Sequence, residues 1–157
     1  MHGGGLPELT SSYPEHLVRP EVLSGHGGAG ILLAEDVAES TVVVLQSDIF
    51  GDTIDEAEVI AGYSHAAAAL DPGSGALLMV ARSTADARLK VLRRERHDDA
   101  DPTAIEWVEL ADLGLQDATR PDVIATPNGT LLVLRVESST IHLHEGSSHG
   151  EVWEELA

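Results

Sequence analysis

Three histidines near the carboxyl end of the chain have the spacing of a metal-binding group. His142 and His144 alternate along an expected strand, so their side chains point to one face, and His149 follows in the next turn. Three imidazoles arranged in this way can bind zinc or nickel. The chain has eight histidines, so the pair can also arise by chance on an exposed strand face. The acidic turn Asp98–Asp101 has carboxylates suited to calcium, but it lacks the glycine and the terminal glutamate of an EF-hand loop, so a solvated linker is favoured there. We expect no cofactor.

Two tryptophans and two arginines are the candidates for binding a ligand. Trp107 and Trp153 recur in different parts of the chain, and an aromatic platform is typical of sugar-binding pockets. Arg19 and Arg120 each open the pattern Arg-Pro-acid-Val-aliphatic. Arginines beside carboxylates on strands are commonly ion pairs, and the repetition of this dipeptide also fits a structural role. We therefore expect these four residues to bind a ligand or support the fold, and none of them to be catalytic.

These residues lie within a unit that occurs three times along the sequence. Gly30, Gly75 and Gly129 each begin an apolar strand, and they lie 45 and 54 residues apart. Repeats of this period are typical of propeller blades and other arrays. The repeat therefore predicts the architecture more directly than any single motif does.

Each copy of the unit is expected to contain four short antiparallel strands. A strand and a turn rich in Gly, Pro or Asn precede each anchoring glycine, and two further strands follow it. The predicted fold is all-β: three four-stranded blades of a β-propeller at about 18–61, 62–111 and 118–157, after an N-terminal arm over 1–17. A β-sandwich or barrel is the alternative. Two stretches, Ala66–Leu70 and Ile54–Ala61, are also compatible with helix by propensity.

Two turns resemble the Asp-box of sialidase-like, or BNR-repeat, β-propellers. The segments Ser47–Ile54 and Ser147–Trp153 each place a glycine three residues before a bulky apolar residue, as in the family pattern Ser-x-Asp-x-Gly-x-x-Trp. The match is degenerate, because Asp48 lies one position early and Ser148 stands where the aspartate is expected. In that family the box is a structural turn. The resemblance therefore implies that these residues maintain the fold and do not catalyse.

The same resemblance raises the less favoured interpretation of a sialidase-like glycosidase. Such enzymes carry an arginine cluster, a nucleophilic tyrosine activated by glutamate, and an acid/base aspartate. The residues of this chain that fit those roles are Arg19, Arg82, Arg120, Arg135, Tyr63 and Asp48. Because arginines on strands more often form ion pairs, we expect the chain not to be an enzyme.

The composition excludes several classes of partner. Twenty-seven acidic residues against nine basic ones give a formal net charge of -18, which repels nucleic acid and anionic membranes. The shortage of lysine beside abundant acid resembles proteins of salt-loving organisms, although a preference for arginine codons explains it equally well. We find neither a long apolar run nor the parts of a signal peptide. The expectation is a soluble protein without membrane insertion, located in a virion or the cytoplasm.

Three blades leave two sheet faces uncovered, because propellers typically have at least four. The chain is therefore expected to form a homo-oligomer, with a six-bladed dimer favoured, or to join other subunits of a larger assembly. Two classes of function follow. The first is a non-catalytic structural or interaction module, such as a structural or receptor-binding subunit of a phage or archaeal virus. The alternative is a glycan-binding lectin of the β-propeller type.

Overall fold

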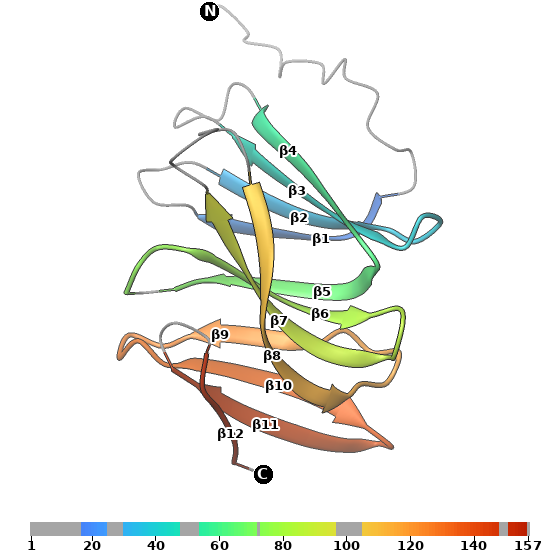
Figure 1. The fold of residues 1–157 in the computed structure, drawn as a ribbon, viewed down its shortest axis with the longest axis vertical. Coiled ribbons are helices and arrows are strands. Elements are labelled where there is room, and N and C mark those ends of the chain that lie inside the picture. The colour runs from blue at the N-terminus through green and yellow to red at the C-terminus, as the bar shows by residue number, and fades with distance from the viewer. Residues whose placement is uncertain are drawn as a thin grey trace, which may run out of the picture.

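Three antiparallel sheets of four strands each make up the described part of the chain (Figure 1). The computed structural model describes residues 17–24, 30–47, 54–71, 73–96, 105–147 and 151–156, and it contains no helix within these ranges. The first sheet consists of β1 (Leu17–Ser24), β2 (Gly30–Asp36), β3 (Thr41–Ser47) and β4 (Ile54–Ala61). The middle sheet consists of β5 (Tyr63–Leu70), β6 (Leu77–Ser83), β7 (Arg88–Arg96) and β8 (Ile105–Leu115). The last sheet consists of β9 (Asp122–Ala125), β10 (Leu131–Glu137), β11 (Thr140–Gly146) and β12 (Trp153–Glu155).

The all-β prediction and the four strands per repeat are confirmed. Within every sheet the strands lie in chain order, each hydrogen-bonded to its sequence neighbour. The two stretches compatible with helix are β4 and most of β5. The degenerate Asp-box turns and the predicted arm fall largely on residues 48–53, 148–150 and 1–16, which lie outside the described residues.

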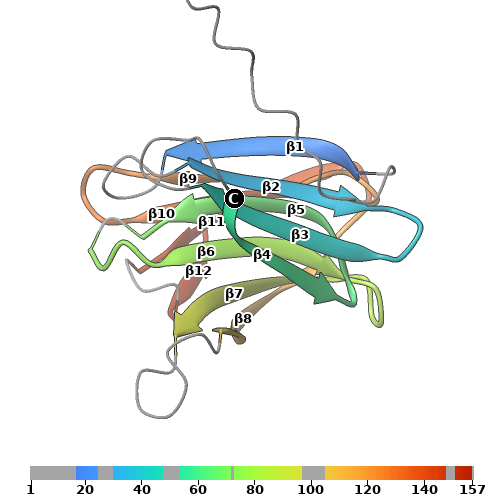
Figure 2. The ribbon, with the colours of Figure 1, turned by 90° about the horizontal axis from the view of Figure 1, so that it is seen from above.

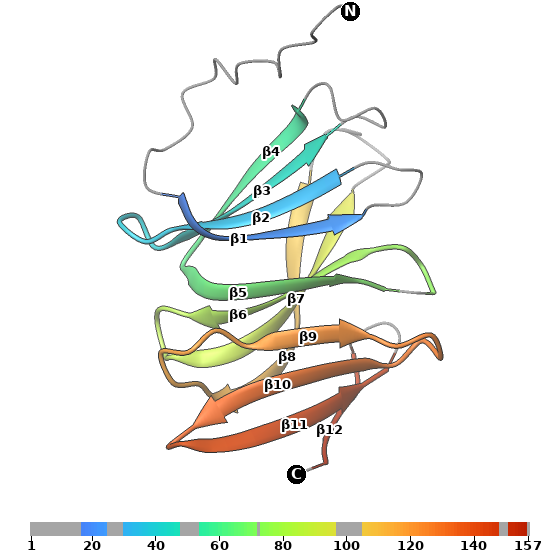
Figure 3. The same cartoon turned by 180° about the vertical axis from the view of Figure 1, so that it is seen from behind.

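The sheets are stacked face to face, with the middle sheet between the other two (Figures 1 and 2). The first strands β1, β5 and β9 follow one another down the stack (Figure 3). β5 contacts β1 and β2 on one side and β9 on the other. The first strand of the middle sheet is therefore covered on both faces.

Two apolar cores fill the spaces between the sheets. Leu33 and Val42 of the first sheet pack with Met79 and Leu92 of the middle sheet, and Leu78 and Val91 on the opposite face of the middle sheet pack with Leu131 and Val133 of the last sheet. Burial of each such side chain contributes about 1.5–3 kcal/mol. Hydrophobic contact between faces therefore holds the stack together.

The alanine run in β5 follows from its position between these cores. Ala66 and Ala68 belong to the core with the first sheet, whereas Ala67 and Ala69 belong to the core with the last sheet. All four are buried. Small side chains let strands approach β5 from both sides, so tertiary contact overrides the helix propensity of alanine.

The strand register shows which residues of the three sheets are equivalent. Glu21 pairs with Leu33, Ala67 with Val80, and Asp122 with Leu134, in each case between the first and second strands of a sheet. Glu21, Ala67 and Asp122 therefore occupy the same place in the repeat. β1 and β5 also carry a bulge just before this place, with positive φ at Arg19 (54°) and His65 (51°).

Candidate functional site

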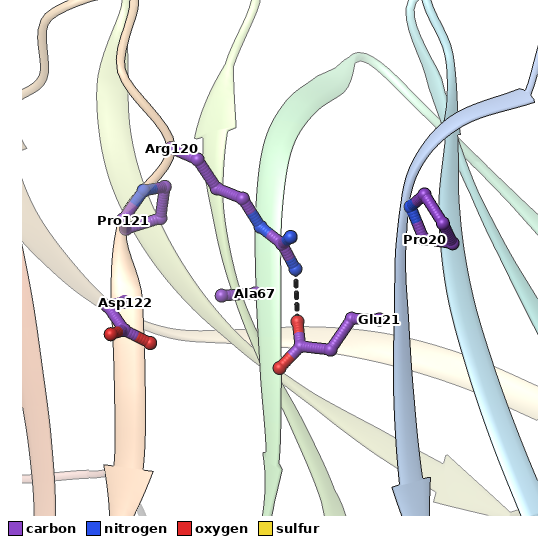
Figure 4. A pocket seen from close by; sticks show the side chains of 6 residues that line it. All are labelled: Pro20, Glu21, Ala67, Arg120, Pro121 and Asp122. Atoms are coloured by element: carbon purple, nitrogen blue, oxygen red, sulfur yellow. Dashed lines mark hydrogen bonds and ion pairs between the residues drawn. The ribbon is translucent and has the colours of Figure 1, made fainter.

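A polar cavity of about 420 Å³ opens where β1, β5 and β9 run side by side (Figure 4). It is lined by Pro20, Glu21, Ala67, Arg120, Pro121 and Asp122. Three of these, Glu21, Ala67 and Asp122, are the equivalent residues of the three sheets. The repeat itself therefore builds the cavity: alanine on the middle strand leaves the space, and carboxylates on the outer two strands flank it.

Arg120, just before β9, crosses the cavity and contacts β5 and β1. Its side chain extends over Ala67 toward Glu21 (Figure 4) and forms an ion pair with the Glu21 carboxylate. The Arg120 Nε atom also donates a hydrogen bond to the carbonyl oxygen of Ala66 at 2.6 Å. The Glu21 carboxylate accepts a second hydrogen bond from the Ala68 backbone nitrogen at 3.3 Å. One guanidinium, from the residue two positions before β9, thus binds groups of both β5 and β1.

The two carboxylates of the cavity differ in their surroundings. Burial raises the pKa of Glu21, with Arg120 acting to lower it and the nearby charge of Asp122 acting to raise it. Asp122 is exposed, and its carboxylate accepts a hydrogen bond from the backbone nitrogen of Val123 at 3.0 Å. The cavity therefore combines strong acceptors with a guanidinium donor, a combination that suits a ligand rich in hydroxyl groups.

Of the four ligand-binding residues predicted from the sequence, Arg120 lines this cavity. Arg19 precedes the lining residue Pro20, but its Nη1 atom donates to Glu35 at 3.0 Å. Trp107 lies at the edge of the core between the first and middle sheets, where its Nε1 atom donates to Glu58 at 2.8 Å. Trp153 packs against the core between the middle and last sheets. The two indole rings therefore support sheet packing and lie apart from the cavity.

Glu21 and Asp122 were missed as site residues in the sequence interpretation. Each is the acid of an Arg-Pro-acid motif. From this motif the sequence analysis predicts only the arginine as a ligand-binding residue. Their equivalence follows from the strand register, which places the acid of the first and the third copy on the first strand of its sheet.

Two histidines of the predicted metal site, His142 and His144, interact with side chains of the last sheet. The His144 Nε2 atom accepts a hydrogen bond from Arg135 Nε at 2.9 Å, and His142 Nδ1 lies 2.5 Å from a carboxylate oxygen of Glu155. His149 lies outside the described residues. Within the described ranges no group of three metal-ligating side chains is arranged to hold an ion, so the histidine site stays a prediction from the sequence.

Two further arginines considered for a sialidase-like cluster are bound to backbone carbonyls. Arg82 Nε donates to the carbonyl oxygen of Gln116 at 3.1 Å, and Arg135 Nη1 donates to that of Leu115 at 2.8 Å. Leu115 is the last residue of β8, and Gln116 follows it in the segment that leads to the last sheet. The Arg135 contact therefore joins the last sheet to the middle one. In the part of the chain that the structure describes, we find no helix long and apolar enough to cross a membrane.

Comparison with known proteins gives a likeness of fold. No family model and no curated protein matches the chain. Among solved structures, it is similar to an exo-β-1,3-galactanase variant from Phanerochaete chrysosporium bound to β-1,3-galactotriose, with a TM-score of 0.58, 14% identity, and coverage of 88% of this chain and 34% of that one. A second variant of the enzyme with the same trisaccharide gives a TM-score of 0.55 and 13% identity, with the same coverage.

The chain spans about a third of the length of these galactanases. At this identity the likeness concerns the fold alone, and the galactanase fold is a β-propeller. The all-β stack of this chain is therefore of a kind that also occurs within a carbohydrate-active enzyme.

Proposed function

We propose that this chain is a carbohydrate-binding module whose three sheets are blades of a β-propeller. One observation carries the proposal: a cavity lies on the first strands of all three sheets, and equivalent residues of the repeat line it. The fold shared with galactanases that hold a galactose trisaccharide supports a sugar as the ligand.

The chemistry of the cavity supports recognition through hydrogen bonds. Asp122 and Glu21 accept hydrogen bonds from sugar hydroxyl groups, and Arg120 donates to sugar oxygens. Among the described residues that line the cavity there is no aromatic ring on which a sugar stacks. We therefore expect weak binding, with a Kd of about 1 mM for a short oligosaccharide.

A binding role fits the cavity better than hydrolysis. Glycoside hydrolysis generally needs one carboxyl group that delivers a proton and a second that acts as base or nucleophile. Here the carboxyl group with the raised pKa, Glu21, is held by the Arg120 guanidinium and the Ala68 backbone nitrogen. A group fixed in this way is poorly placed to give its proton to a glycosidic oxygen.

The test is a calorimetric titration with β-1,3-galactobiose, β-1,3-galactotriose and a sialylated trisaccharide. The Asp122→Asn variant is expected to weaken binding about tenfold, because a charge-assisted hydrogen bond becomes a neutral one. Glu154→Gln is the control: it removes the same charge from an exposed residue of β12. Absence of saturable binding to all three sugars, or an unchanged affinity in Asp122→Asn, contradicts the proposal.

The same samples distinguish binding from catalysis. Reducing sugar measured after long incubation with the galactose oligosaccharides is expected to stay at the level of a protein-free blank. Release of sugar by the wild-type chain, lost in Asp122→Asn, would identify a glycosidase instead.

A second candidate function is a structural or interaction module. The observation in its favour is the apolar outer surface of both end sheets, where Val22 and Ile141 are 75% and 63% exposed. Large exposed apolar surfaces mark contact sites between proteins. The virion setting and the adaptation to salt stay predictions from the sequence.

A further inference from the structure

The outward face of the last sheet is an apolar surface. Ile124, Leu134 and Ile141 are 57%, 39% and 63% exposed, and Leu132 and Leu143 beside them are half-buried. The register places these residues on the face that points away from the middle sheet, since Val123 and Val133 on the other face belong to the inner core. We call this surface the donor face.

Residues of the donor face are equivalent, by strand register, to residues that pack in the two cores inside the stack. Leu23 pairs with Ile31, Ala69 with Leu78, and Ile124 with Leu132, so the first member of each pair occupies one place in the repeat. Leu23 packs on the core between the first and middle sheets, and Ala69 is buried in the core between the middle and last sheets. Ile124 is the third member of this series, and it is exposed.

The outward face of the first sheet is equivalent to the face of the middle sheet on which Leu23 packs. Four residues of the middle sheet, Ala68, Leu77, Met79 and Leu92, belong to the core against which Leu23 packs. Their equivalents by register on the first sheet are Val22, Gly30, Leu32 and Leu45.

These four equivalents line an apolar hollow of about 150 Å³, together with Ile31 and Ser47. Where the middle sheet has Leu77, the first sheet has Gly30, and the Ser47 hydroxyl lies beside it, accepting a hydrogen bond from the Gly30 backbone nitrogen at 2.8 Å. Val22, at its rim, is exposed, whereas Leu45 is buried. We call this surface the acceptor face.

We propose that the donor face of one copy of this chain packs on the acceptor face of a second copy, with Ile124 in the hollow. The contact repeats the packing of the first sheet on the middle sheet and of the middle sheet on the last. Two copies joined head to tail by two such contacts bring six sheets around one axis, within the usual range of propellers. The inference goes beyond sugar binding and does not depend on it.

Charge makes the assembly dependent on salt. Each copy carries a formal charge of -18, and the register places Glu145 and Glu154 beside Leu132 on the donor face. Salt screens repulsion between the copies, and excluded salts strengthen apolar contacts. The dimer is therefore expected to be tighter in molar salt than in dilute buffer.

The test is the mass in solution, measured by sedimentation equilibrium in molar sodium chloride. The wild-type chain is expected at twice its own mass of 16.6 kDa. Ile124→Asp on the donor face and Val22→Asp on the acceptor face are each expected at the mass of one chain. The control is Val37→Asp, at a valine that is 59% exposed in the turn after β2 and belongs to neither face, and it is expected to remain dimeric.

Mixing the two face variants tests the head-to-tail arrangement. Ile124→Asp keeps an intact acceptor face and Val22→Asp keeps an intact donor face, so an equal mixture is expected to form dimers through one contact. A wild-type monomer, an open polymer larger than a dimer, a dimer of either variant alone, or a mixture that stays monomeric overturns the proposal. Circular dichroism of each variant shows whether the strands are retained.

Discussion

The carboxylate of Glu35 joins the first sheet to the middle sheet by hydrogen bonds, and its removal is expected to lower the free energy of unfolding. It lies at the end of β2 in the first sheet, and its side chain is only 2% exposed. Its Oε2 atom accepts a hydrogen bond from the His65 backbone nitrogen at 2.8 Å, and its Oε1 atom accepts one from that of Ala66 at 3.0 Å. Both donors lie in the bulge of β5, where the ladder with β6 is interrupted. Glu35 thus supplies the acceptors that the bulge removes.

The structure allows the cost of losing this carboxylate to be worked out. In Glu35→Ala two backbone donors lose a charged acceptor, and each unsatisfied donor costs about 1–3 kcal/mol. We therefore expect the free energy of unfolding to fall by about 2–6 kcal/mol, a large part of the stability of a typical domain. The ion-pair partner Arg19 is 40% exposed, so Arg19→Ala is expected to cost no more than about 1 kcal/mol.

Urea unfolding followed by circular dichroism at neutral pH and constant salt measures both variants. The matched control is Glu39→Ala, which removes the same charge from an exposed turn residue and is expected to change stability by no more than about 0.5 kcal/mol. If Glu35→Ala shifts the unfolding midpoint no more than the control, or no more than Arg19→Ala, then the backbone hydrogen bonds to Glu35 do not hold the sheets as argued.

Three further predictions concern other contacts between and within the sheets. Gly146→Ala is expected to destabilise the chain by about 1–3 kcal/mol and to change tryptophan fluorescence, because the added Cβ would lie 2.7 Å from ring carbons of Trp153; unchanged fluorescence and stability would contradict this placement of the ring. Trp107→Phe is expected to cost about 1 kcal/mol by removing the hydrogen bond to Glu58, and a double-mutant cycle with Glu58→Gln should show coupling. Burial, with the nearby Arg135 charge, lowers the pKa of His144, so its contribution to stability is complete above the unfolded pKa of about 6.5 and is lost as pH falls below it. The melting temperature should therefore drop between pH 7 and pH 5, and His144→Gln should make that drop smaller.

The strands could be predicted from the sequence because each repeat carries its own local signals. The anchoring glycines and the Gly, Pro and Asn turns bound apolar runs of strand length, and β2, β6 and β10 cover most of the runs predicted after them. The helix propensity of Ala66–Leu70 was misleading for a physical reason. This segment lies between two sheets, and contact on both faces requires small residues, which a local scale cannot express.

The cavity could be predicted only in part, because it depends on register and on the order of the stack. Arg120 was identified from its motif, yet its partner Glu21 lies 99 positions away in the chain, and no local pattern joins the two. The sequence predicts the tryptophans as sugar platforms because aromatic rings are common in such sites. The structure places both indole groups against the cores between the sheets, where Trp107 also donates to Glu58.

An NMR titration tests the proposed sugar site most directly. Backbone amide shifts of the labelled chain would be followed while β-1,3-galactotriose is added, with sucrose as the control sugar. Saturable shifts are expected to cluster on the first strands of the three sheets, at Glu21, Ala67 and Asp122, and the Asp122→Asn variant is expected to diminish them. Shifts centred on Trp107 or Trp153, or no shifts beyond those caused by sucrose, would contradict it.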